Sequence, residues 1–118
     1  MDSDGLSDPY VQIKLGDQVI NDCENYKQDE TNCEVYKMYE LKTRLPGVSQ
    51  LHVQFWDRDN YVSDDLIGES IIDLENRFFS KVWRNLPYVP VETRDLFIPT
   101  SMVSRGRVTL FLEMIPSN

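Results

Sequence analysis

The stretch that decides the fold is residues 51–69, LHVQFWDRDNYVSDDLIGE. Apolar and polar side chains alternate over residues 51–56, which indicates a strand with one face in a core. A loop rich in aspartate follows, and a second apolar run begins at Leu66. Asp57 and Asp59 stand two residues apart, so at the end of an extended segment both carboxylates can point to one side. We expect such a pair to share a hard cation.

The composition describes an acidic chain of 118 residues, with 20 acidic and 12 basic side chains and a net charge of -8. A chain of this length can bury a core without disulfide support, so we expect one domain over residues 1–118. The charge argues against nucleic acid, whose binding needs a basic surface that neutralises phosphate. It also argues against a bare anionic membrane, unless bound divalent cations supply local positive potential.

Targeting signals and cysteine spacing indicate an intracellular chain. No apolar run reaches the length of about 18 residues that a spanning helix needs, and the first residues are polar and acidic, unlike a signal peptide. Cys23 and Cys33 form neither a CxxC pair nor a zinc spacing, so we expect two reduced structural thiols. His52 has no neighbouring nucleophile and is expected on the polar face of its strand.

Other segments also alternate, and together they predict the fold class. Short strands with little helix and no strand–helix rhythm are typical of an all-β chain folded as an antiparallel β-sandwich. A long, irregular or helical connection precedes the last strand, and Gly68 indicates a bulge or a close backbone approach. Besides residues 51–56, strands are expected at residues 9–15, 18–22, 35–43, 66–74, 96–98 and 107–115, with one or two helical turns in 75–83.

Two acidic loops, residues 1–8 and 57–65, are each joined to a strand end, and loops at one end of a sandwich cluster together. Close pairs of carboxylates repel by on the order of 4 kcal/mol at an effective dielectric of about 20. A cation relieves this repulsion, and flexible loops rich in oxygen favour calcium. An EF-hand does not fit, because its sixth and twelfth positions counted from Asp57 would be Val62 and Gly68. The alternative is a set of ordinary solvated acids.

The two acidic segments resemble a known family. DSDGLSDPYVQIKLG at residues 2–16 and FWDRDNYVSDDLIGE at residues 55–69 are similar to the first and third calcium-binding loops of a C2 domain. The resemblance implies a C2-like Greek key and carboxylates that bridge two calcium ions, whereas Asp4 and Asp64 do not match the pattern. The implied metal ligands are Asp2, Asp8, Asp57, Asp59 and Asp65.

A narrower resemblance is to the C2 domains of ferlins. It rests on NDCENYK at residues 21–27, DDLIGESIIDLENRFFSK at residues 64–81 and VPVETRDLFIPTS at residues 89–101. In this ferlin-type topology the strand that precedes the first loop is missing, and Asn32-Cys33 replaces the expected Asn-Pro. The resemblance therefore implies a fragment of a larger multi-domain protein, or an edge beside the last strand that another segment, another domain or a strand-donating chain fills.

The ferlin resemblance implies a calcium-dependent phospholipid-binding module in vesicle fusion or membrane trafficking. Its partner would be the anionic surface on the cytoplasmic face of a membrane, to which the parent protein is anchored. Tyr61 and Val62 stand at the tip of the second acidic loop and are expected to insert into lipid once calcium cancels the negative field. The alternative for Tyr61 is packing on its own loop.

A second functional interpretation is a calcium-independent interaction or scaffold module, which the missing strand and Cys33 favour. An enzyme is not expected, because Asp57 and Asp59 have no partner base for acid–base chemistry. We accordingly expect no small-molecule substrate.

Overall fold

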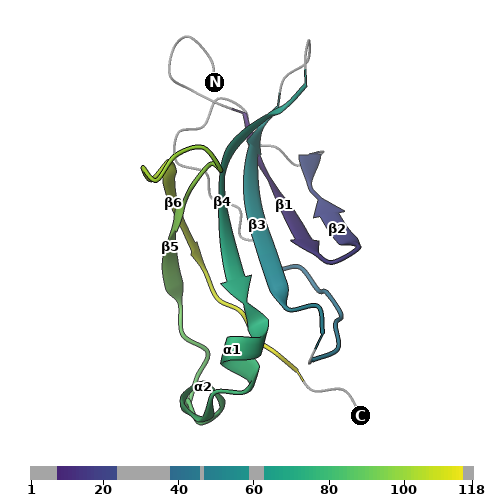
Figure 1. Ribbon diagram of the computed structural model, residues 1–118, viewed down its shortest axis with the longest axis vertical. Coiled ribbons are helices and arrows are strands. Elements are labelled where there is room, and N and C mark those ends of the chain that lie inside the picture. The colour runs from purple at the N-terminus through teal and green to yellow at the C-terminus, as the bar shows by residue number, and fades with distance from the viewer. Residues whose placement is uncertain (1–7, 24–37, 46, 59–62, 116–118) are drawn as a thin grey trace.

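The computed structural model describes residues 8–23, 38–45, 47–58 and 63–115. Its main element is a four-stranded antiparallel sheet (Figure 1), in which the strands lie in the order β2 (Gln18–Asn21), β1 (Pro9–Leu15), β3 (Gln50–Asp57) and β4 (Asp65–Asp73). Helices α1 (Leu74–Phe78) and α2 (Lys81–Arg84) lead to a hairpin of β5 (Glu92–Leu96) and β6 (Gly106–Leu110).

The core lies on one face of this sheet, where the apolar members of each alternating strand point. Burial of each aliphatic side chain contributes about 1.5–3 kcal/mol, and Ile72 is only 1% exposed. The buried cluster consists of Val11, Ile13, Leu15, Leu51, Val53, Ile72 and Leu74.

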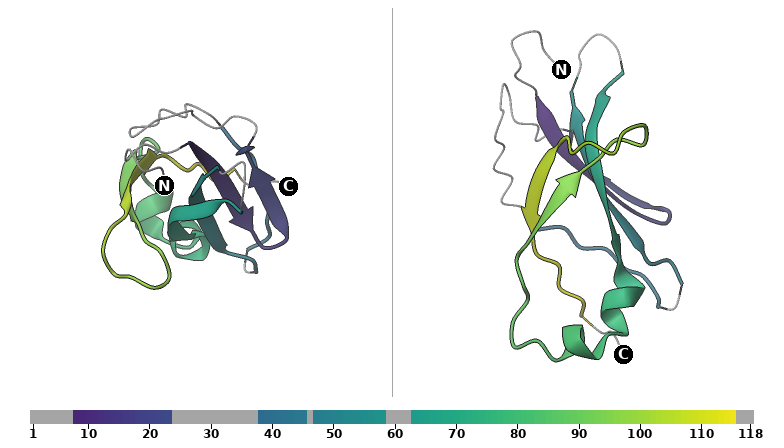
Figure 2. Two further views of the ribbon diagram at one scale, coloured as in Figure 1. Left: turned by 90° about the horizontal axis from the view of Figure 1, so that it is seen from above. Right: turned by 60° about the vertical axis from the view of Figure 1, so that its left-hand side comes forward.

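A second layer covers the cluster. It comes from β6 and residues 111–115, which supply Leu110, Leu112 and Met114, and from residues 38–45. The right-hand view of Figure 2 shows the hairpin as a layer beside the four-stranded sheet. The predicted antiparallel β-sandwich is thereby confirmed.

Most predicted strands are present, and the expected helical turns form α1 and α2. We predicted a strand at residues 35–43. Of these, the structure describes residues 38–43, which form no strand, so the prediction is wrong there. Tyr39 and Leu41 nevertheless pack inward on the core. At Lys42 the backbone pairs with a side chain. Its N–H donates to Gln18 Oε1 at 2.9 Å, and its carbonyl accepts from Gln18 Nε2. A side chain thus replaces a strand partner.

Two later predictions need correction in their boundaries. The last strand ends at Leu110, although inward and outward side chains continue to alternate through Met114. The strand expected at residues 96–98 begins earlier, as β5, and Phe97 continues it by pairing with Glu69. Cys23 is a free thiol, as expected, and Cys33 lies outside the described residues.

The buried side chain of Arg77 holds the helical connection to the hairpin. Asp73 caps α1 by accepting from the backbone N–H groups of Glu75 and Asn76. Arg77 is buried, ion-pairs with Glu92 of β5 at 2.5 Å and lies 4.4 Å above the ring of Trp83. These contacts tie α1 and α2 to the hairpin. Neither helix, nor any other among the described residues, has the length and apolar character to cross a membrane.

The hairpin meets the four-stranded sheet at Gly68 and Glu69. The backbone groups of Glu69 and Phe97 exchange two hydrogen bonds of 2.8 and 3.0 Å. A β-carbon added at Gly68 would lie 2.7 Å from the β-carbon of Leu96. The close backbone approach predicted for this glycine is therefore present.

We expect Gly68→Ala to lower the free energy of unfolding by about 1–3 kcal/mol, as overpacking of a tight contact does. Where a glycine is unstrained, alanine instead stabilises by reducing the entropy of the unfolded chain. The sign of the change therefore tests the contact. Urea denaturation followed by tryptophan fluorescence measures it, and a variant as stable as the wild type would contradict the packing of Leu96 against Gly68.

Candidate metal centre

The predicted metal ligands fall in two groups. Three of the five carboxylates belong to the described part of the chain, and each stands at or beside a strand end: Asp8, Asp57 and Asp65. The other two, and the apolar residues expected at the loop tip, lie outside the described residues: Asp2, Asp59, Tyr61 and Val62.

Asp8 and Asp57 lie side by side although 49 positions separate them. The backbone N–H of Asp8 donates to Asp57 Oδ1 at 2.9 Å, and the backbone N–H of Arg58 donates to the carbonyl of Asp8 at 3.0 Å. Pairing of Pro9 with Asp57 in the β1–β3 ladder sets this arrangement. Asp8 and Asp57, where the two acidic segments adjoin their strands, therefore meet at one end of the sheet.

An irregularity in the β3–β4 ladder brings in Asp65. Phe55 lies opposite Gly68, but the next residue, Trp56, lies opposite Leu66, so β4 accommodates one extra residue there. Without the shift, Leu66 would lie opposite Asp57. With it, Asp65 takes that place.

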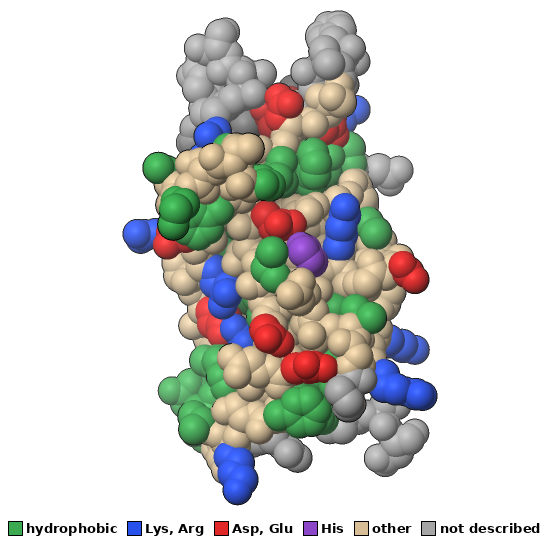
Figure 3. All heavy atoms as spheres, in the orientation of Figure 1, with side chains coloured by type: hydrophobic (Ala, Val, Ile, Leu, Met, Phe, Trp, Pro, Cys, Tyr) green, Lys and Arg blue, Asp and Glu red, His purple; other side chains and the backbone are tan. Residues whose placement is uncertain are grey.

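The carboxylate of Asp57 is nearly enclosed, with the residue 6% exposed. A buried carboxylate requires hydrogen bonds or a counter-charge, because desolvation penalises its charged form. The Asp8 N–H provides one such bond. Figure 3 shows acidic side chains at this end of the molecule.

The chemistry of the donors fits a hard cation. Aspartate oxygens without histidine or cysteine suit calcium, whose shell takes six to eight oxygens. Among the described residues, no three His, Cys, Asp or Glu side chains converge to hold a metal ion.

Asp64, which does not match the ligand pattern, has a different partner. The hydroxyl of Tyr10 donates to Asp64 Oδ2 at 2.6 Å, and Tyr10 is 6% exposed. Burial, followed by the bond to the Asp64 carboxylate, raises the pKa of the Tyr10 hydroxyl above its ordinary value. Sequence reasoning missed this contact, because a tyrosine on the polar face of a strand gives no sign of a partner 54 positions away.

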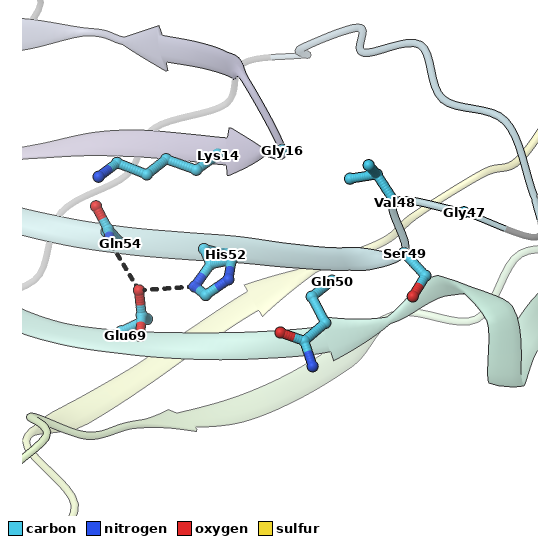
Figure 4. A pocket seen from close by; sticks show the side chains of 9 residues that line it. All are labelled: Lys14, Gly16, Gly47, Val48, Ser49, Gln50, His52, Gln54 and Glu69. Atoms are coloured by element: carbon cyan, nitrogen blue, oxygen red, sulfur yellow. Dashed lines mark hydrogen bonds and ion pairs between the residues drawn. The ribbon is translucent and has the colours of Figure 1, made fainter.

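The outer face of the sheet carries a shallow hollow, shown in Figure 4, that lies away from the acidic end. Glu69 accepts from Gln54 Nε2 at 2.6 Å and contacts His52 Nδ1 at 3.1 Å. Among the side chains labelled there, Lys14 is the only lysine or arginine. His52 is thus a sheet-face histidine, as predicted.

The same face holds a row of side-chain hydrogen bonds across all four strands. Asn21 donates to Gln12 at 2.6 Å, Gln12 to Gln54 at 2.8 Å, and Gln54 to Glu69. Each strand contributes one member, in the order β2-β1-β3-β4. The row braces the sheet that carries the acidic residues at its end.

Comparison with known proteins gives one family and several relatives. A family model described as C2 domain matches residues 1–86. Over 80 residues, 68% of this chain, the sequence is 44% identical to myoferlin of Homo sapiens and 42% identical to that of Mus musculus. Over 79 residues, 67% of this chain, it is 42% identical to Fer-1-like protein 4 of Mus musculus. The chain spans 4% of the length of each of these relatives.

We expect Asp57→Ala to lower the free energy of unfolding of the calcium-free chain by about 1 kcal/mol more than Asp57→Asn does. Both variants remove the charge, but asparagine keeps an oxygen that can accept from the Asp8 N–H. Chemical denaturation measures the difference. The exposed Glu113 supplies the control, since Glu113→Ala and Glu113→Gln should differ little. Equal stability of the two Asp57 variants would contradict a structural role for that bond.

Proposed function

Because the chain belongs to the C2 domain family, whose model covers residues 1–86, we propose that it is a calcium-dependent phospholipid-binding module. We further propose that it is one domain of a larger ferlin-like protein in vesicle fusion or membrane trafficking, and that it faces anionic lipid on the cytoplasmic side of a membrane. The identity with myoferlin and Fer-1-like protein 4 supports the ferlin assignment. No catalytic step and no small-molecule substrate are part of the proposal.

One observation carries the calcium proposal. The hydrogen bond from the Asp8 backbone to the Asp57 carboxylate holds the ends of both acidic segments together. The register that puts Asp65 opposite Asp57 adds a carboxylate at the same end. Like charges directly opposite one another destabilise a sheet, so this arrangement favours a cation that binds between them.

The proposed ligands fall into two groups by their position in the chain. Asp8, Asp57 and Asp65 are fixed by strand ends, whereas Asp2 and Asp59 would complete the shell from the loops, with shared carboxylates for two ions. Calcium, when bound, supplies positive potential and open coordination positions for lipid phosphate or carboxylate.

Tyr61 and Val62 are proposed to enter the headgroup region beside the ions. Full burial of a tyrosine side chain of about 150–200 Å² contributes at most about 4 kcal/mol, and an interface recovers part of that. Insertion alone is a weak anchor. Membrane binding should therefore depend on calcium and aromatic insertion together.

We expect the wild-type chain to release or absorb heat on titration with calcium, and the double variant Asp57→Asn, Asp59→Asn to give no binding heat. The double variant removes two ligand charges while keeping side-chain size. The control is Asp17→Asn, Glu113→Gln, which makes the same charge change at exposed positions away from the acidic end. Isothermal titration calorimetry is the measurement, and absence of wild-type heat at millimolar calcium would overturn the proposed function.

We expect Tyr61→Ala to reduce calcium-dependent sedimentation with phosphatidylserine vesicles, because the variant loses apolar area that enters the interface. Tyr88 is 73% exposed and lies between α2 and β5, so Tyr88→Ala is the matched control. Pelleting is compared in calcium and in chelator. Unchanged pelleting of Tyr61→Ala would exclude the insertion step.

A calcium-independent interaction module is the second candidate, and exposed apolar side chains favour it. Phe79, Val82 and Val91 stand out from the helical connection and the start of β5, with Val82 75% exposed. Exposed apolar side chains of this kind suit contact with another domain of the same protein or with a separate protein chain. Partner binding that persists in chelator, with no calcium heat, would identify this function.

A further inference from the structure

Tyr10 connects two segments that the backbone ladder leaves unjoined. Its hydroxyl donates to Asp64 Oδ2 at 2.6 Å. β1, which carries Tyr10, and β4, which begins directly after Asp64, are not neighbours in the sheet, because β3 lies between them. The bond therefore reaches across β3 to the residue before β4.

The donor end of this bond is fixed. Tyr10 is 6% exposed and lies opposite Trp56 in the β1–β3 ladder. A buried aromatic ring in a paired strand has few conformations, so its hydroxyl is a defined point in space. Bonds from a hydroxyl to a carboxylate at this distance are about twice as strong as those between neutral groups.

The acceptor end lies next to a proposed ligand. Asp64 directly precedes Asp65, and Tyr10 follows Asp8 by two residues. One side-chain bond thus joins β1, which follows the first acidic segment, to Asp64, the last residue but one of the second. β-sheet pairing positions Asp65 opposite Asp57, and the Tyr10 bond holds Asp64, the residue directly before it.

From this juxtaposition we propose that Tyr10, acting through Asp64, is a positioning residue of the calcium site. The inference rests on the proposed function. Tyr10 binds no calcium itself. It sets where Asp65 stands relative to Asp8 before the ion arrives, so that less rearrangement of Asp65 is needed on binding.

The test combines calcium affinity with a measurement on the calcium-free chain. Tyr10→Phe keeps the ring and removes the hydroxyl, and Asp64→Ala removes the acceptor. Each is expected to weaken calcium binding roughly tenfold in calorimetry, and the double variant should be no weaker than the single ones, because they remove the same bond. In the calcium-free chain, both should speed amide hydrogen exchange between Asp57 and Leu66 while β1 stays protected.

Tyr39→Phe is the matched control. The Tyr39 hydroxyl donates to Asp22 Oδ2, also at 2.6 Å, and neither residue is a proposed ligand, so its loss should leave affinity and loop exchange unchanged.

The outcomes separate the two proposals. If the wild type binds calcium but Tyr10→Phe has unchanged affinity or unchanged loop exchange, the inference is overturned and the proposed function still stands. Additive losses in the double variant, or faster exchange throughout the chain, would also overturn it. A wild-type chain that does not bind calcium would overturn both.

Discussion

The register between β1 and β3 is the constraint on which the rest of the structure depends. A slip of one residue would turn every inward side chain to the opposite face, exposing Val11 and Val53 of the core. The same register sets Pro9 opposite Asp57 and so brings Asp8 to the Asp57 carboxylate. Core packing, which is worth several kilocalories per mole, therefore fixes the geometry of an acidic end that would be unfavourable by itself.

The bulge in β4 is consistent with the proposed calcium site, because it changes which residue lies opposite Asp57. A regular ladder would place Leu66 opposite Asp57, whereas the shift after Phe55 places Asp65 there. For a sheet without a cation, the apolar residue is the better neighbour for a nearly buried carboxylate, since it adds no repulsion. The irregularity thus places two like charges opposite one another, which a calcium ion bound between them would neutralise. The close contact at Gly68 and the polar row on the outer face support the same sheet.

How far the sequence predicted the structure depended on whether a feature was local. Strands such as residues 9–15 and 51–56 carry a period of two because one face is buried, so alternation alone identifies them. The acidic segments were identifiable by their motifs. The conformation of residues 38–43 was not predictable, because the Lys42 backbone is paired by the side chain of Gln18, 24 positions away. The Tyr10–Asp64 bond likewise depends on two strands that only folding brings into reach.

The distribution of charge and apolar surface indicates how the domain would stand on a membrane. In the hollow on the outer face, Glu69 lies beside His52, and Lys14 is the only lysine or arginine among the nine lining residues, so the hollow gives an anionic headgroup little attraction. The acidic end would attract one only through bound cations. The molecule measures 48 × 28 × 25 Å, and Figure 1 shows the start of β1 and the helix α2 at opposite ends of the long axis. A domain bound by its acidic end would therefore stand upright, holding the apolar side chains of the helical connection away from lipid, where a neighbouring protein surface can reach them.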